Sequence, residues 1–419
     1  MSTVCCKVAG IEVHKRILAV VIIDSADATN ECASVTFGTT HRDLTELRIF
    51  LAEHQVTHAA MESTAQYWRP VWLALEGDFE PVLTQARATR ARRGRKPDME
   101  DARRIARRFL SGDLKVSYVP GPEQREWRLL SRTRIAVVES IVRLRNQIEV
   151  VLEQAQIKLT SVVSDVLGLS GRRILRALIE GVTDPAQLAE LAHHRLRSSR
   201  ETLVNALTGH ITNAQRLVLK MQLEQVEQME QMERHMDELE YPLAQAQASC
   251  QDAITRLCEI PGVSAGAAQQ IIAEIGPDAQ AFESAAQLAS WVGVSPGRQE
   301  SAGVSTSDRS PKGNRVLRRL LSQSAWAAIA RKGSEAQRRY RRWIIRMGAQ
   351  KAAWAVAHYL LRVIWKILHE HVRYVPPDSA TLDRQAILRK LKRAAADLRR
   401  FGYTVSITPP DEQQYSQQT

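Results

Sequence analysis

Residues 6–23, CKVAGIEVHKRILAVVII, contain two short, mostly apolar runs separated by the polar residues His14, Lys15 and Arg16. A third run, ECASVTF at 31–37, follows a second polar connection. Apolar runs of this length, bounded by short polar connections, are typical of consecutive strands. The opening of the chain therefore predicts a β-meander.

Helical and strand patterns alternate after the meander. A helix opened by the capping residues Ser63 and Thr64 is expected in the middle of this stretch. The expected elements are a helix at 41–54, a strand at 57–63, a helix at about 64–76, a strand at 80–86 and a helix through 99–110. This order predicts a mixed α/β domain of about 115 residues.

The rest of the chain has a helical pattern. From Glu126 to Leu159, apolar residues are spaced three and four apart, and a second such stripe runs from Leu219 to Leu243 with a slip between Val226 and Met232. An antiparallel coiled-coil hairpin or a dimerising arm fits these stripes, and two ordinary core helices fit them equally well. The fold class is thus α/β plus all-α, and the expected domains are residues 1–120, 121–250, 251–375 and a basic, polar tail at 376–419.

The composition favours a polyanionic partner. The 419 residues carry a formal net charge of +12 and have a pI near 9.7, without a lipidation signal or amphipathic anchor. No apolar run is long enough to span a bilayer, and the N-terminus lacks the pattern of a signal peptide. A cytoplasmic nucleic-acid-binding protein is expected, although a merely basic soluble protein fits these numbers too.

Four acids are predicted to converge in the N-terminal domain. Glu12 interrupts an apolar strand, Glu62 ends a later strand, and Asp98 and Asp101 lie three apart, on one face of a helix. Clustered carboxylates raise one another's pKa and need a cation between them, and oxygen ligands suit Mg²⁺ or Mn²⁺. A solvated or capping role fits the Asp98–Asp101 pair equally well.

Basic residues accompany these acids. A run just before Asp98 is expected to hold a nucleic-acid backbone while the acids hold the metal ion that acts on it. Its candidate phosphate contacts are Arg92, Arg93, Arg95 and Lys96.

Two further candidate sites lie in the distal half. Residues 257–276 read as a helix, a tight turn at Pro261 and Gly262, and a second helix, whose free N–H groups are suited to a DNA phosphate. A plain helical connection is the alternative. The loop between Gly293 and Gly313 then carries several serines, which are flanked by Arg298, Arg309, Lys312 and Arg315. By residue types alone it is best read as a flexible phosphate-binding loop.

The motifs GIEVHK at 10–15, MESTAQYWRPVW at 61–72 and GRKPDMEDA at 94–102 resemble the acidic motifs of a transposase family. This is the insertion-sequence family with an N-terminal RuvC-like DEDD domain and a C-terminal serine transposase domain. The resemblance implies a ribonuclease-H-like fold, with Glu62, Asp98 and Asp101 on the second, third and fourth acids. Glu12 stands where the family usually has Asp, which leaves open a compensating backbone shift or a weakened enzyme.

SPGRQESAG at 295–303, followed by KGNRVLRR at 312–319, resembles the signature loop of the same family, with Ser301 in the place of its nucleophile. Val304 departs from the basic residue that the family often has there. The resemblance implies cutting and rejoining of donor and target DNA through a phosphoserine link, in a composite site shared between protomers of a dimer or tetramer. It also implies guidance by a noncoding bridge RNA. A junction-resolvase-like nuclease that uses water, or a nonenzymatic nucleic-acid scaffold, remains an alternative.

Overall fold

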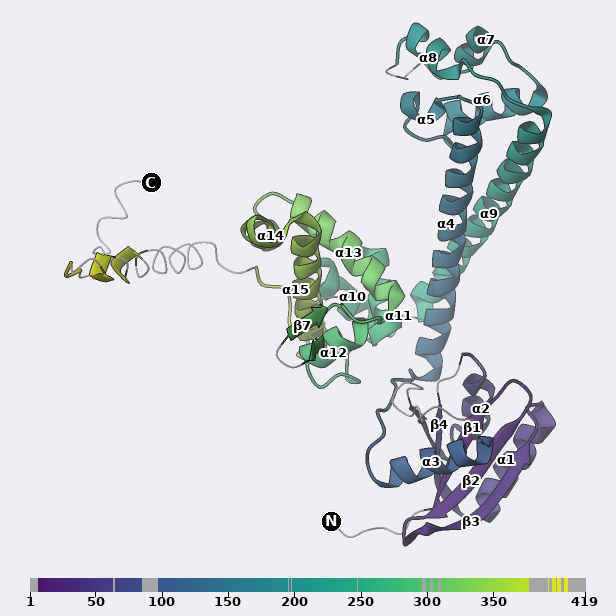
Figure 1. Cartoon of the computed structure of the whole chain (residues 1–419), viewed down its shortest axis with the longest axis vertical. Coiled ribbons are helices and arrows are strands. Elements are labelled where there is room, and N and C mark those ends of the chain that lie inside the picture. Colours follow the sequence, from purple (N-terminus) through teal and green to yellow (C-terminus); the bar gives the residue numbers. More distant parts are fainter. Residues whose placement is uncertain are drawn as a thin grey trace. The chain divides into compact units, whose positions relative to one another are not determined.

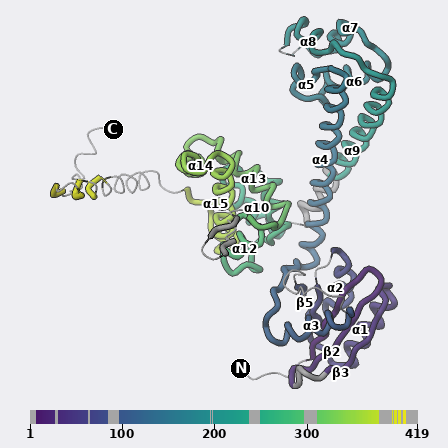
Figure 2. Tube along the Cα trace, in the orientation of Figure 1, coloured from purple at the N-terminus to yellow at the C-terminus, as the bar shows by residue number. Residues whose placement is uncertain are grey.

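The computed structural model describes residues 7–62, 65–84, 97–194, 196, 198–246, 248–295, 299–301, 304–307, 310–376 and short pieces at 391, 394–396, 398–400 and 403–405. At 27–30, 237–246, 248, 299–301 and 304–307 it describes the backbone alone. The chain divides into two compact units, residues 1–121 and 122–419, whose traces are shown in Figure 2.

The first unit is built on a five-stranded sheet. Its strands are β1 (Lys7–Val13), β2 (Leu18–Asp24), β3 (Asp27–Phe37), β4 (Val56–Glu62) and β5 (Glu80–Thr84), in the order β3-β2-β1-β4-β5. β1, β2 and β3 form the predicted antiparallel meander, and β4 and β5 run parallel to β1. This mixed sheet is consistent with the expected RuvC-like domain.

Helices cover both faces of the sheet (Figure 1). α1 (His41–Glu53) and α2 (Trp68–Leu75) pack over one face, where Leu47 and Val71 share a buried cluster with Ile11 of β1. α3 (Asp98–Leu110) packs over the other face. The prediction that a helix starts at about Thr64 was wrong, because Ala65 has a positive φ of 49° and residues 65–67 form a turn. Ser63 and Thr64 lie outside the described residues.

The second unit begins with two long helices that run in opposite directions side by side, α4 (Pro122–Gln154) and α9 (Asn213–Ala246) (Figure 1). A small helical insert joins them, and its side chains share one core with both helices. Val226 of α9 is fully buried but Met232 is 47% exposed, so burial weakens where the spacing slips. The insert helices are α5 (Leu159–Val162), α6 (Leu169–Glu180), α7 (Pro185–Glu190) and α8 (Arg200–Leu207).

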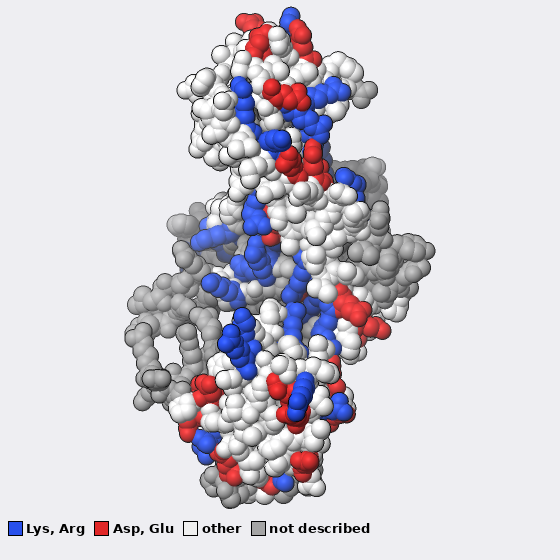
Figure 3. Space-filling model, turned by 90° about the vertical axis from the view of Figure 1, so that its right-hand side faces the viewer, with Lys and Arg blue, Asp and Glu red and all other residues white. Residues whose placement is uncertain are grey.

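Several charged side chains are paired on the long arm, which is formed by α4, α9 and the insert helices. The upper part of the face shown in Figure 3 has Lys and Arg side chains interleaved with Asp and Glu. Arg176 of α6, for example, lies 2.7 Å from Glu227 of α9, and Arg200 lies 2.8 Å from Glu190. Such exposed pairs contribute little stability, but they neutralise the local charge.

The remaining helices form a separate bundle around α15. They are η1 (Ala248–Cys250), α10 (Gln251–Cys258), α11 (Ala265–Ile275), α12 (Ala285–Val292), α13 (Arg315–Ala330), α14 (Glu335–Met347) and α15 (Ala349–His369), with a hairpin of β6 (Gln299–Ser301) and β7 (Val304–Ser307) between α12 and α13. α15 is rich in apolar residues, and its buried residues include Val356, Leu361 and Ile364. Within the described residues, no helix has the length and apolar character needed to cross a membrane. The finer division of this unit at residue 250 stays a prediction.

A buried carboxylate joins α4 to this bundle. Glu274 of α11 is fully buried, and Arg132 of α4 donates to both of its oxygens, at 2.7 and 2.8 Å. Asn314 donates to the same carboxylate at 2.7 Å while its side-chain oxygen accepts from the backbone N–H of Leu317, which caps α13. The Glu274 carboxylate therefore connects α4, α11 and the start of α13.

Candidate active site

The first candidate site is set by the close packing of α3 on β1. At Gly10, a Cβ atom would lie 2.1 Å from the carbonyl oxygen of Ala102 and 2.7 Å from the backbone nitrogen of Ala106. Only glycine allows this approach, since a real side chain would force the helix away. The first turn of α3 is thereby held close to the sheet.

Glu12 and Glu62 lie on the two neighbouring central strands. Ile11 of β1 pairs with Met61 of the parallel strand β4, so Glu12 and Glu62 follow side by side, one residue further on. Both glutamates are buried. Ile11, the residue before Glu12, packs on the side of the sheet that α1 and α2 cover. Alternation along β1 therefore directs Glu12 toward the α3 face, as the sequence predicts.

The aspartates of α3 complete the group. Asp98 and Asp101 both lie in the first turn of this helix, and Asp101 is paired with Arg104. The His14 Nε2 lies 3.2 Å from Asp98 Oδ1 and 4.0 Å from Glu12 Oε1, so its ring stands between these two carboxylates. Sequence reasoning missed His14, although it follows Glu12 by two residues and alternation directs it to the same side.

The electrostatics of Glu12 show that the four acids act on one another. Burial, and next the charge of Glu62, raise the pKa of Glu12 to about 7. His14 opposes this shift, while Asp101 and Asp98 add to it. The Glu12 Oε2 atom is buried and has no hydrogen-bond donor in the described part of the chain. A buried, unpaired carboxylate oxygen among other acids is a place where a cation is favourable.

These residues fit a divalent metal ion by their chemistry. Oxygen ligands from two glutamates and two aspartates suit Mg²⁺ or Mn²⁺, and the unpaired oxygen of Glu12 is available to one. Among the described residues, however, no three His, Cys, Asp or Glu side chains already stand close enough to hold an ion together. The structure brings the four acids to one end of the sheet but does not close them into a finished ligand set.

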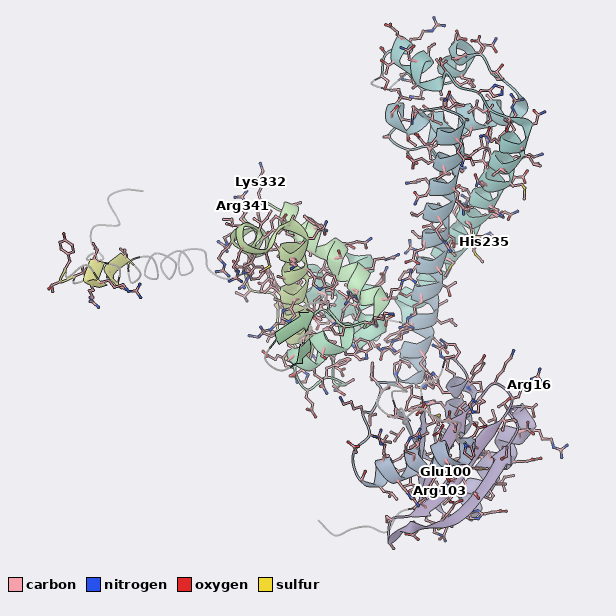
Figure 4. The ribbon with its side chains drawn as sticks, in the orientation of Figure 1. Arg16, Glu100, Arg103, His235, Lys332 and Arg341 are labelled. Carbon is pink, nitrogen blue, oxygen red and sulfur yellow. The ribbon has the colours of Figure 1, made fainter. Side chains whose placement is uncertain are left out.

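Glu100 is a different kind of acid from its neighbours on α3. Its carboxylate contacts Arg103, whose Nε also donates to Glu31 of β3 at 2.7 Å (Figure 4). The hydrogen bond that Arg103 donates to Glu31 is the main reason why the pKa of Arg103 is raised. Glu100 and Arg103 therefore tie α3 to the sheet and leave Asp98 and Asp101 for the site.

The second candidate site is the loop that carries Ser301. The backbone of Ser301 ends β6 and pairs with Val304 of β7, which places the serine at the closed end of a short antiparallel hairpin. Its side chain, and those of Ser305 and Ser307, lie outside the described residues. The loop connects α12 to α13, two helices that both pack against α15.

The two ends of this loop are pinned together in what we call the neck, formed by Gly293, Pro311, Gly313 and Arg318. A Cβ atom at Gly293, where φ is +78°, would lie 2.6 Å from the Pro311 carbonyl oxygen, and one at Gly313 would lie 2.2 Å from that of Val292. The Arg318 Nη1 donates to the carbonyls of both Gly293 and Pro311. The serine loop is therefore anchored at its base.

Trp354 of α15 contacts two residues at the base of the loop. Its indole N–H donates to the Ser310 Oγ at 3.0 Å, and the Arg318 guanidinium lies 4.7 Å from the centre of its ring. Sequence reasoning missed Arg318 and Trp354 as supports, because nothing in their local spacing links them to the loop.

The predicted phosphate contacts have different surroundings. Lys312 is exposed, whereas Arg315 lies 3.1 Å from Glu139 of α4, which neutralises part of its charge. Gly262 has a φ of +89°, and a Cβ atom there would lie 2.4 Å from the Ser324 carbonyl oxygen, so close packing on α13 explains this glycine. The start of α11 beside it is exposed. Arg92, Arg93, Arg95, Lys96, Arg298 and Arg309 lie outside the described residues.

Two domain models of known proteins match the parts of the chain that contain the candidate sites. Residues 9–157 match a transposase domain model named for its DEDD acids and the IS110 elements, and this range contains all four acids. Residues 254–341 match a model described as transposase IS116/IS110/IS902 family, and this range contains the serine loop. Between them, the two models match more than half of the chain.

A relative from Pseudomonas aeruginosa strain PAO1, described as a probable family 20 transposase, is 25% identical over 291 residues, which is 68% of this chain and 75% of the relative. The relative's description agrees with both domain matches, which occur here in one chain. The chain therefore belongs to the IS110/IS116 family of transposases, with a DEDD domain at its N-terminal end and the family's second transposase domain toward its C-terminal end.

Proposed function

We propose that this chain cuts and rejoins the DNA of an insertion sequence, with Ser301 as the nucleophile and with Glu12, Glu62, Asp98 and Asp101 holding a divalent metal ion. One observation carries the proposal. The charges of Glu62, Asp101 and Asp98 act on the buried Glu12, whose Oε2 has no hydrogen-bond partner among the described residues, and residues 254–341 of the same chain match a transposase domain.

The chemistry assigns separate tasks to the two sites. Mg²⁺ or Mn²⁺ at the acids would neutralise charge on the scissile phosphate. The Ser301 Oγ forms a bond to phosphorus as one ester oxygen departs, and that oxygen takes the proton that the hydroxyl loses. The product is a phosphoserine link, which a second DNA end reverses to rejoin the strands. The neck, by anchoring the loop, limits the positions that the hydroxyl samples.

Basic residues supply the DNA contacts in this proposal. Arg92, Arg93, Arg95 and Lys96 immediately precede the first acid of α3, and Arg298, Arg309, Lys312 and Arg315 flank the serine in sequence. Gly262 would allow a phosphate to approach the exposed start of α11.

A noncoding bridge RNA as guide, and assembly as a dimer or tetramer with composite sites, belong to the same proposal, and the net charge of +12 supports an RNA partner. Sequencing the nucleic acid that co-purifies with the protein tests the guide. Recovery of one discrete structured RNA supports it, and recovery of random host RNA counts against it.

Trapping the covalent link tests the nucleophile. The protein is incubated with Mg²⁺ and duplex DNA carrying the ends of its insertion sequence, denatured, and examined for a protein–DNA adduct. Ser301→Ala is expected to abolish the adduct. Ser305→Ala, in the paired strand of the same hairpin, is the matched control and is expected to retain it. An adduct that survives Ser301→Ala rules out this nucleophile.

A metal-dependent, junction-resolvase-like nuclease is the second candidate. The four acids all belong to the first unit, so a metal ion held by them would activate water without any residue of the serine loop. This function predicts Mg²⁺-dependent cleavage of branched DNA. The Ser301→Ala variant would cleave as fast as the unchanged protein, and neither protein would form a covalent adduct with DNA.

A further inference from the structure

We propose that the outward face of α14, made by Arg341, Arg342, Ile345 and Arg346, binds the phosphate backbone of duplex DNA flanking the reacting phosphate. The inference deepens the proposed function, because it assumes that this chain acts on DNA, but it concerns a surface away from both candidate sites.

The spacing of these four residues forms one continuous face. Positions i, i+1, i+4 and i+5 lie together on a helix. All four side chains are exposed, and Ile345 is 89% exposed in the middle of the three arginines. Figure 4 shows Arg341 at the outer end of the bundle, near Lys332, which is also exposed and adds a further cation.

The charges on this face are not neutralised. Within the described residues, Arg341, Arg342 and Arg346 have no Asp or Glu within ion-pair distance, in contrast to the paired arginines of the long arm. The nearest acid on the helix, Glu335, is buried and pairs instead with Arg338 and Arg339, at 3.1 and 2.7 Å. The outer arginines are therefore free to meet a polyanion.

The inner side of α14 fixes this face in place. The Arg339 guanidinium lies 4.2 Å from the centre of the Tyr359 ring on α15. Ser334, which caps the helix, accepts from the Gln337 N–H at 3.0 Å and donates to the Ala328 carbonyl of α13 at 2.7 Å. A rigid face loses less entropy when it binds phosphates than a mobile segment does.

The position of α14 relative to the serine loop suggests which DNA it meets. α13 begins at the neck and has 16 residues, so at 1.5 Å per residue it spans about 24 Å before α14 starts. Duplex DNA rises about 3.4 Å per base pair, and 24 Å corresponds to about seven base pairs. A duplex reacting at the loop would have backbone within reach of α14 about seven base pairs away. The match to a transposase domain covers α14 as far as Arg341, the first residue of this face.

Salt-dependent binding tests this surface. The probe is a 30-base-pair duplex of arbitrary sequence, and the full-length test variant is Arg341→Gln with Arg342→Gln and Arg346→Gln. The plot of log affinity against log salt concentration has a negative slope, and loss of three phosphate contacts is expected to make it shallower by about 2 to 3. Binding at 0.1 M salt is expected to weaken by about tenfold. No cleavage is needed, so the result does not depend on whether Ser301 is the nucleophile.

A control with the same change in net charge separates the surface from the charge. It carries Arg42→Gln, Arg176→Gln and Arg200→Gln, which remove three exposed arginines already paired with glutamates. The control is expected to bind the duplex nearly as the unchanged protein does. Equal slopes in the two variants, or no loss in the test variant with an unchanged melting temperature, would overturn the proposal. A loss confined to an RNA hairpin of equal length would also overturn it, since the surface would then serve RNA.

Discussion

Glu12 in the first unit and Glu274 in the second are both buried glutamates, but they differ in the charge of their neighbours. Glu12 lies near Glu62, Asp98 and Asp101, and burial with these charges raises its pKa to about 7. Burial alone raises the pKa of Glu274 too, but the hydrogen bond and charge of Arg132, with Arg128 and Asn314, hold it below its ordinary value. Among the described residues, no Lys or Arg pairs with Glu12, whereas Arg128 and Arg132 both pair with Glu274.

This contrast separates a site from a structural joint. A carboxylate surrounded by arginine and amide donors has its hydrogen bonds satisfied and needs no ligand. A carboxylate buried among other acids with an unpaired oxygen is costly unless an ion joins it, and such costs are retained mainly at functional sites. The contrast gives four predictions, which begin with the largest effect.

Glu12→Gln is expected to reduce Mg²⁺-dependent adduct formation on DNA carrying the element ends by about 100-fold or more, because it removes a charge facing the reacting phosphate's metal ion. Glu100→Gln is the matched control, since Glu100 lies in the same helical turn as Asp98 and Asp101 but contacts Arg103. It is expected to retain activity within a few fold. Glu12→Asp, which restores the family's usual residue, is expected to remain active. Equal losses in Glu12→Gln and Glu100→Gln would remove Glu12 from the site.

Glu274→Ala is expected to destabilise the second unit by about 3 kcal/mol, because it leaves Arg128 and Arg132 without their buried partner. Chemical denaturation measures this change. Glu139→Ala is the control, because Glu139 is partly exposed where it pairs with Arg315 and Arg319, and its loss is expected to cost about 1 kcal/mol. Equal effects of the two substitutions would show that the Glu274 network is not a structural joint.

The sequence predicts the position of Glu12 but not the role of Glu274. The order of strands and helices in the first unit follows from local pattern, and alternation about Ile11 correctly directs Glu12 to the face opposite its neighbours. The role of Glu274 could not be predicted, because its partners on α4 and at the start of α13 lie 142 and 40 residues away. Pairing over such distances depends on the packing of helices, which has no local signature. The side chain of Ser301 stays a prediction from resemblance.

The stability of the first unit without metal is expected to depend on pH in the direction set by Glu12. Its folded pKa of about 7 lies above the ordinary value of 4.5, so its protonated form stabilises the fold below pH 4.5, and this stability is lost as pH rises to 7. In EDTA, the melting temperature should therefore fall by a few degrees between pH 4.5 and pH 8. Addition of Mg²⁺ at pH 8 should restore it. Glu12→Gln should remove both responses. A melting temperature in Glu12→Gln that still rises with Mg²⁺ would place the ion elsewhere.

His14 gives the smallest and most specific prediction, because its ring lies between Glu12 and Asp98. A ring in this position occupies space beside the oxygens that would hold a metal ion, and it pairs with both carboxylates. His14→Gln is therefore expected to lower the Mn²⁺ concentration needed for half-maximal thermal stabilisation by about two- to threefold. His58→Gln is the control, because His58 pairs with Glu80, outside the acid group. No change in the His14 variant would show that the ring does not compete with the ion, while an increase would make His14 a metal ligand and enlarge the site beyond four carboxylates.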